Sequence, residues 1–128
     1  MFLFPYPRDL RLTLIDPARP VTAGLMYNDL RAAEQSARLR RLPPADSWRR
    51  TGFVPTATSG LAKAMWLVEN VGVGAGRRLA HQVDLINARL TGAPTATDAS
   101  HAMKTGVDLF TGGWPVAEFG TIGLPVEA

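Results

Sequence analysis

The chain of 128 residues contains no cysteine, which excludes disulfide bonds, thiolate metal sites and cysteine nucleophiles. It also lacks any uncharged apolar run of about 18 residues, the length that a membrane-spanning helix needs. The first residues, MFLFPYPRDL, have no basic start and are interrupted by Pro5 and Pro7, unlike a secretory signal peptide. We therefore expect a soluble protein without membrane contacts, located in the cytoplasm or within a virus particle.

Net charge is also small. The chain carries 14 Lys and Arg residues against 11 Asp and Glu, a formal net charge of +3. A field this weak does not by itself indicate a nucleic-acid partner, so that function has to rest on local clusters of arginine.

Histidine is scarce, with only His81 and His101. His81 and Asp84 could face one helix turn, but no second pair of metal ligands accompanies them. Asp98, Ser100 and His101 are residue types of hydrolases, yet their adjacency and the absence of G-x-S-x-G argue against a nucleophile. We expect no catalytic residue, no metal, no cofactor and no small-molecule ligand.

Glycine and proline are abundant instead, with 12 and 10 residues respectively. Together they make up more of the chain than is usual, which predicts long irregular arms around a smaller regular centre. We expect a single domain made of an N-terminal arm over residues 1–21 with a short strand, a helical body over 22–111 and a C-terminal arm over 112–128. The predicted fold class is mainly α, a small bundle of about three helices with a minor two-stranded β element as an optional addition.

The spacing of apolar residues predicts where the strands and helices lie. Alternation in DLRLTLI predicts a strand over residues 9–15, and the tail around Ile122 and Leu124 alternates as a possible partner strand. Helices are predicted over about 25–42, 59–92 and 98–111, and residues 43–58 are predicted to be irregular. Ser59 is the expected N-cap of the long central helix, and Gly92 its expected C-terminal signal.

The central helix is unusual because VGVGAG lies in its middle, where each glycine costs about 1 kcal/mol relative to alanine. Gly72, Gly76 and Ala80 would share one face and allow another helix to pack closely. The alternative interpretation is a strand, a turn at the glycines and a helix starting at Arg77, with the turn binding a phosphate. The glycine spacing does not match the dinucleotide fingerprint, so we favour packing or a kink.

Apolar and aromatic residues in the two arms are candidates for contacts between subunits, because aromatic anchors dominate many interfaces. The alternative is that they fold back onto the core of their own chain. The candidate interface residues are Phe2, Phe4, Tyr6, Leu10, Leu12, Leu14, Trp114, Phe119, Ile122 and Leu124.

Arginines cluster over residues 31–50, with Trp48 available to stack on a base. Glu34, three or four positions from Arg31 and Arg38, could instead pair with either of them on a solvated helix face. The candidate nucleic-acid residues are Arg31, Arg38, Arg41, Arg49 and Arg50.

Together these patterns predict a non-enzymatic structural or adaptor subunit of a larger assembly, such as a virion connector or decoration protein or a secretion-machine component. We expect a homo-oligomer that binds other protein subunits through its arms. The alternative function is a small Arg-rich nucleic-acid-binding protein, and a nucleotide binder or enzyme at the glycine-rich segment is a third hypothesis.

Overall fold

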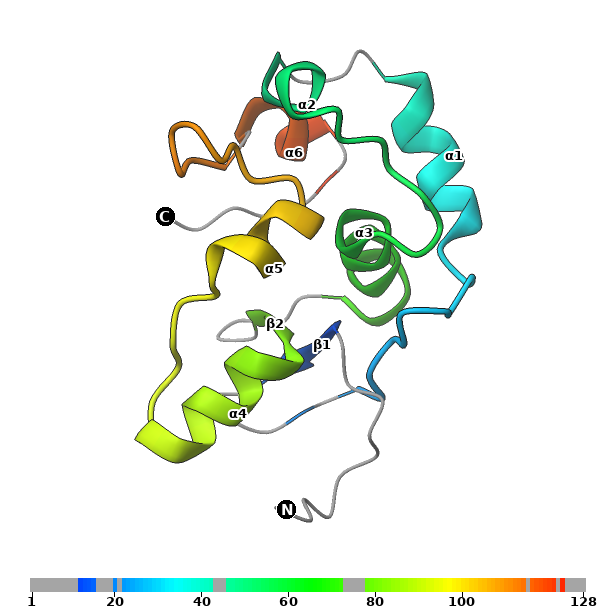
Figure 1. Cartoon of the computed structure of the whole chain (residues 1–128). Helices are drawn as coiled ribbons and strands as arrows, with labels where there is room; N and C mark the ends of the chain where they lie inside the picture. Colours follow the sequence, from blue (N-terminus) through cyan, green and yellow to red (C-terminus); the bar gives the residue numbers. More distant parts are fainter. Residues whose placement is uncertain are drawn as a thin grey trace.

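The computed structural model describes residues 12–15, 20, 22–42, 46–72, 78–114, 116–121 and 123. This part of the chain is mainly helical, as the sequence predicted, but it contains six helices rather than three (Figure 1). In chain order the elements are β1 (Leu12–Ile15), α1 (Ala33–Arg41), α2 (Asp46–Thr51), α3 (Gly60–Val71), β2 (Arg78–His81), α4 (Gln82–Thr91), α5 (Ala99–Lys104) and α6 (Val116–Thr121).

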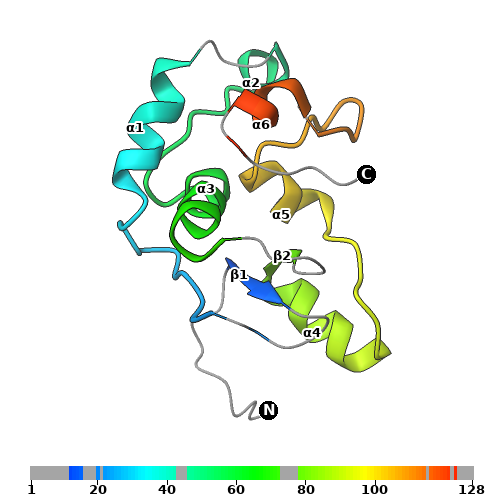
Figure 2. The same ribbon diagram turned by 180° about the vertical axis from the view of Figure 1, so that it is seen from behind.

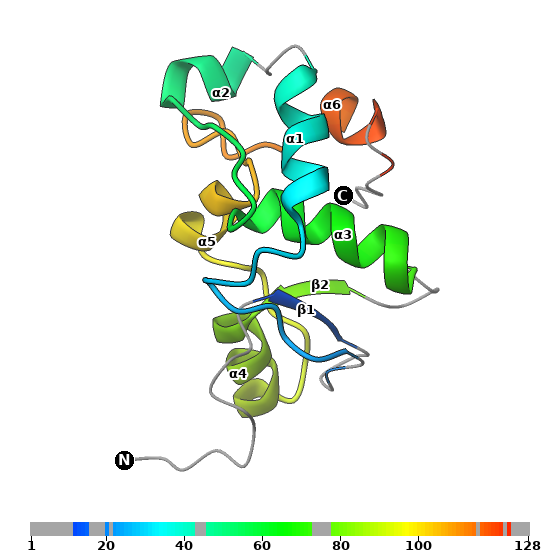
Figure 3. The ribbon, with the colours of Figure 1, turned by 90° about the vertical axis from the view of Figure 1, so that its right-hand side faces the viewer.

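Helix α3 occupies the centre of the fold. It contacts α1 on one side and β1 on the other, so that Figure 3 shows it between α1 and the strands. Leu61, Ala64 and Leu67 are fully buried along it, and the first two belong to the apolar spacing that predicted a helix. The buried cluster around α3 also includes side chains from the loop before α1, from α1, from α2 and from α6: Leu25, Ala32, Leu39, Trp48 and Phe119.

The predicted central helix over residues 59–92 is wrong, because the chain breaks in its middle. Helix α3 ends at Val71, and Gly72 has φ 76°, a backbone conformation that L side chains rarely adopt. Ala80 lies in β2, so Gly72 and Ala80 do not share a helix face, and a Cβ at Gly72 would meet nothing within 4 Å. The prediction that Gly72, Gly76 and Ala80 form one helix face for close packing is therefore wrong. Gly76 itself lies outside the described residues, as does most of VGVGAG.

The alternative interpretation did place a break at the glycines, but with a strand before it and a helix after it. In the structure the order is reversed, with helix α3 before the break and strand β2 after it. Both predicted ends of the segment are nevertheless correct. The hydroxyl of Ser59 accepts a hydrogen bond from the backbone N–H of Ala62, and Gly92 ends α4 in the left-handed conformation with φ 73°.

The strand predicted before residue 16 is present as β1, and it pairs antiparallel with β2, Leu12 opposite His81 and Ile15 opposite Arg78. Figure 2 shows the two strands side by side next to α3 and α4. The sequence offered the C-terminal tail as the partner strand instead. Of that tail, residues 116–121 form α6, while Ile122 and Leu124 lie outside the described residues.

Three other predicted bounds change for local reasons. The first helix begins at Ala33 rather than near residue 25, and the segment before it buries Leu25 as a loop. The third helix ends at Lys104, since Gly106 has φ 97° and stops helical propagation. Residues 46–51, predicted to be irregular, form α2.

The arms can be followed only in part. Phe2, Phe4, Tyr6 and Leu10 lie outside the described residues, and Leu12 and Leu14 lie in β1. Phe119 is 4% exposed and belongs to the core, with its ring centroid 5.6 Å from that of Trp114. For Phe119 the fold-back alternative therefore describes the structure, whereas the three-part division of the chain stays a prediction. No helix in the described part of the chain is long and apolar enough to cross a membrane.

Candidate binding cavity

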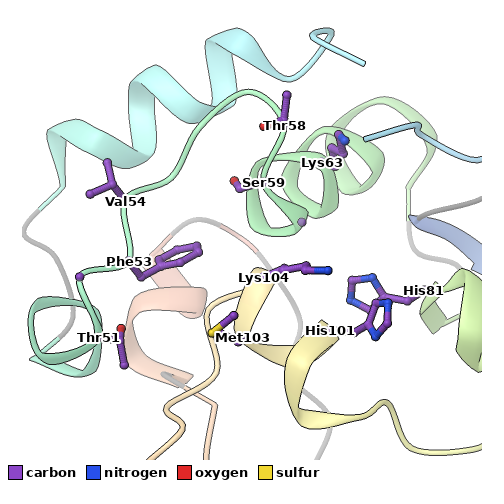
Figure 4. Close-up of a pocket in the computed structure, with 12 residues that line it drawn as sticks. Thr51, Phe53, Val54, Thr58, Ser59, Lys63, His81, His101, Met103 and Lys104 are labelled. Atoms are coloured by element: carbon purple, nitrogen blue, oxygen red, sulfur yellow. The ribbon is translucent and has the colours of Figure 1, made fainter. Parts of the chain in front are cut away.

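A cavity of about 410 Å³ opens between the α2–α3 loop, the first turn of α3, the end of β2 and α5 (Figure 4). Its volume is in the range of small-molecule sites. Phe53 and Met103 provide apolar wall, while Lys63, His81, His101 and Lys104 bring nitrogen atoms to it. The four polar side chains come from three different elements that only the tertiary fold brings together.

The start of α3 and the end of α5 touch closely at Gly60. A Cβ placed on Gly60 would lie 2.7 Å from Oγ1 of Thr105 and 2.9 Å from the carbonyl oxygen of Lys104. Real Cβ atoms do not approach other atoms so closely, so this wall of the cavity requires glycine.

Asp98 is the N-cap of α5, and its carboxylate accepts hydrogen bonds from the backbone N–H groups of Ser100 at 2.9 Å and of His101 at 3.1 Å. The same carboxylate accepts from Oγ of Ser100 at 2.7 Å and contacts Nδ1 of His101 at 2.6 Å. These bonds, the Ser100 hydroxyl first and His101 next, hold the pKa of Asp98 far below its ordinary value. An ionised carboxylate only accepts hydrogen bonds, so Nδ1 of His101 must carry a proton.

His81 lies beside His101, with the ring centroids 5.1 Å apart and the planes tilted by 52°. It is 7% exposed. Its Nε2 lies 3.0 Å from Oγ1 of Thr105, and its backbone N–H donates to Asp84 at 2.8 Å, which fixes the start of α4. His81 therefore ties β2, α4 and the end of α5 together behind the ring of His101.

The two lysines differ in their surroundings. Lys63 is 2% exposed and donates from Nζ to the backbone carbonyl of Met26. Lys104 is only half-buried, and its side chain extends towards the imidazole rings of His81 and His101 (Figure 4). Lys104 is thus the lysine placed to reach a molecule in the cavity.

Trp48 is buried in the core, where it contacts Phe53 of the cavity lining, so its ring is not available to stack on a nucleic-acid base. It is 3% exposed, donates from Nε1 to the carbonyl oxygen of Gly106 at 3.0 Å and meets Phe53 edge to face at 5.4 Å between centroids. Base stacking on Trp48, which the sequence suggested, is therefore wrong.

Three of the five candidate nucleic-acid arginines pair with carboxylates of this chain. Arg31 pairs with Asp29 at 2.8 Å and lies over the ring of Trp66, Arg38 pairs with Glu69, and Arg50 pairs with Asp108 at 2.7 Å. Asp29 and Glu69 therefore pair with Arg31 and Arg38, in place of Glu34, which the sequence offered as their partner. The other two, Arg41 and Arg49, are exposed at the ends of α1 and α2.

Of the residues that line the cavity, only the two histidines were considered from the sequence as catalytic or metal-binding residues, and both were rejected, whereas Lys63 and Lys104 were not considered. His81 with Asp84 was weighed as a metal pair, and Asp98, Ser100 and His101 as hydrolase residues. The informative signal was narrower: an aspartate at an N-cap with a histidine three residues later predicts a carboxylate-held imidazole. In the described residues no three His, Cys, Asp or Glu side chains lie close enough to share a metal ion.

Comparison with known proteins finds similar sequences and a similar solved structure. No protein-family profile matches the chain. The xylulose kinases of Streptomyces rubiginosus and Streptomyces coelicolor are each 39% identical, over 99 and 101 residues, which is 74% of this chain and 20% of each kinase. The chain therefore spans about a fifth of the length of these curated relatives.

A solved structure shows the same fold. The glycerol kinase of Plasmodium falciparum, crystallised with ADP, matches 93% of this chain and 26% of its own length with a TM-score of 0.75 and 17% sequence identity. At this identity the match establishes the fold, which is that of one part of the glycerol kinase chain.

These matches overturn the functional predictions from the sequence. The relatives in sequence and in structure are kinases, so a non-enzymatic structural or adaptor subunit is wrong, and so are the virion and assembly assignments. The Arg-rich nucleic-acid-binding alternative fails for the same reason. Self-association and contacts with other protein subunits stay predictions.

Proposed function

We propose that this chain forms one part of a carbohydrate kinase, an enzyme that transfers the terminal phosphoryl group of a nucleoside triphosphate to a hydroxyl oxygen of a small sugar. The observation that carries the proposal is the 39% identity to two xylulose kinases over 99 and 101 residues. The fold shared with glycerol kinase over 93% of the chain supports it independently of sequence.

The substrate class that we favour is a ketopentose such as xylulose. Identity to the xylulose kinases is more than twice the 17% identity to glycerol kinase. In the reaction the sugar hydroxyl oxygen forms the new bond to phosphorus, the bridging oxygen leaves with the nucleoside diphosphate, and the hydroxyl proton is released. Such transfer depends mainly on positioning and electrostatic stabilisation.

The described residues contribute positioning and a binding cavity. They provide no group of three acidic or histidine side chains that fits the divalent cation which kinases use with the nucleotide, so we assign this chain no step through a metal. Its contribution is the α3-centred core, with the contact of Gly60 on α5 fixing the cavity wall.

A chimera tests the proposal. The matched segment of the Streptomyces rubiginosus xylulose kinase would be replaced by the aligned residues of this chain, and xylulose-dependent ADP formation measured in a coupled assay. We expect a folded chimera with activity within about tenfold to a hundredfold of the parent, because a remote misplacement of about 1 Å can cost a hundredfold.

The chimera carrying Gly60→Val is the matched negative control, since the added side chain collides with Thr105 and with backbone. Gly120→Ala is the neutral control, because nothing lies within 4 Å of a Cβ at Gly120. A chimera that is folded by circular dichroism and monodisperse, yet shows no xylulose-dependent turnover, would contradict the proposal.

A further inference from the structure

The ionisable side chains that line the cavity are all basic. Of the residues that the structure places around it, two are lysines and two are histidines, and none is aspartate or glutamate. The adjacent carboxylate, Asp98, is already engaged by Ser100 and His101 and is not part of the lining. A cavity with cationic donors and without carboxylate acceptors favours an anionic ligand over a neutral sugar.

Two groups are placed to bind that ligand. Nδ1 of His101 is held by Asp98, so Nε2 is the ring nitrogen left to meet a ligand. The side chain of Lys104 points towards the same ring (Figure 4). Nε2 of His81 faces Thr105, so His81 orients the ring of His101 by contact and does not offer a donor of its own to the ligand.

We propose that this cavity binds a phosphate group, as inorganic phosphate or as a phosphate monoester, through Nζ of Lys104 and Nε2 of His101. Lys63 adds positive charge to the wall while its ammonium holds Met26. The volume of about 410 Å³ exceeds what a phosphate ion fills and leaves room for a small sugar attached to it. The inference stands on the lining of the cavity and does not require the proposed kinase activity, and it replaces the expectation that no small molecule binds.

Binding through His101 requires an N–H at its Nε2. A neutral His101 with its proton on Nδ1 has a lone pair at Nε2, which repels an anion, whereas the protonated ring has a second N–H there. Phosphate is therefore bound by the ring that carries an N–H at both nitrogens. The charged and titratable groups around the ring are Asp98 at Nδ1, His81 on one face and Lys104 at the cavity.

Isothermal titration calorimetry of the 128-residue chain tests the inference. Inorganic phosphate, D-xylulose 5-phosphate and D-xylulose would each be titrated near pH 7 at low salt. We expect saturable binding of at least one phosphate-bearing ligand, and no binding of D-xylulose at the same concentrations. Tighter binding of the sugar phosphate would indicate a phosphorylated sugar, and equal binding would indicate phosphate alone.

Variants locate the site. Lys104→Gln should weaken phosphate binding about tenfold or more, and His101→Gln should also weaken it, because the glutamine side chain is uncharged. Arg40→Gln, which removes the same charge from an exposed position on α1, should leave binding unchanged. Circular dichroism would confirm folding, and Lys104→Glu provides a second test by reversing the charge without adding bulk.

Three results would overturn the inference. They are the absence of phosphate binding at millimolar concentration, binding of D-xylulose as tight as that of its phosphate, and equal weakening by Arg40→Gln and Lys104→Gln. None of these measurements involves ATP, so phosphate binding can be tested even if the proposed kinase function is wrong.

Discussion

Gly60 and Thr105 meet so closely that α3 and α5 can touch only because residue 60 has no side chain. The missing Cβ would lie 2.7 Å from Oγ1 of Thr105. Nε2 of His81 hydrogen-bonds to the same hydroxyl at 3.0 Å, so Thr105 links the start of α3 to β2. This contact joins the central helix to the histidine pair of the cavity.

Gly60→Ala should therefore destabilise the fold by about 1–3 kcal/mol, the usual cost of overpacking. The backbone carbonyl of Lys104, which a Cβ would meet at 2.9 Å, cannot move aside as a flexible side chain would. Gly120→Ala in α6 is the control and should be neutral or slightly stabilising, because a helical glycine has space there. Urea denaturation followed by circular dichroism measures both, and equal midpoints would contradict the prediction.

Trp48→Phe should destabilise the fold by about 1–3 kcal/mol, because it leaves the carbonyl of Gly106 without its donor in a buried site. The indole also packs against Gly106, where a Cβ would lie 3.2 Å from Nε1. Trp114→Phe is the matched control, since Trp114 is 37% exposed and should tolerate the change. Similar unfolding free energies for the two variants would show that the Trp48–Gly106 hydrogen bond contributes little.

Stability should fall in acid through Asp98. Its pKa is lowered in the folded chain, so its contribution is present above the ordinary aspartate value of 3.8 and is lost as the pH falls towards the folded value. Asp98→Asn keeps an N-cap acceptor but removes the charge. The melting temperature of the variant should lie below that of the parent at pH 6, and the difference should shrink by pH 3. A difference that is constant with pH would show that the charge on Asp98 is not responsible.

Local signals in the sequence predicted several elements correctly. Ser59 and Gly92 act on their own neighbours, one by capping a free N–H and the other by adopting a left-handed conformation, so their roles are readable without tertiary information. The alternation around Leu12 and Leu14 likewise predicted a strand in β1.

The break between α3 and α4 was missed because apolar periodicity is ambiguous over short segments. β2 contains only four residues, too few to distinguish a strand from a helix turn, and Leu79 and Val83 happened to continue the helical spacing. The positive φ at Gly72 was the decisive local feature.

The cavity was harder still to predict. His81 and His101 are separated by the whole of α4 and the loop after it, and their contact depends on the docking of α5 against β2 and α3. Periodicity and spacing describe neighbours along the chain, so they could identify each histidine but not the pair. The kinase relationship was also beyond this reasoning, because it rests on 39% identity over 99 residues, which appears only when two sequences are aligned.

Arg50→Ala should loosen the turn after α5 while leaving the core intact. The Arg50 guanidinium pairs with Asp108 at 2.7 Å and lies 5.1 Å from the ring centroid of Phe110. Arg50 is half exposed, so global stability should change by no more than about 1 kcal/mol. Hydrogen exchange should accelerate at the amides of Phe110, which donates to Asp108, and of Gly112, which donates to the Asp108 carbonyl. Arg40→Ala on α1 should leave these amides unchanged, and unaltered exchange in Arg50→Ala would mean that the turn is held by its own backbone bonds.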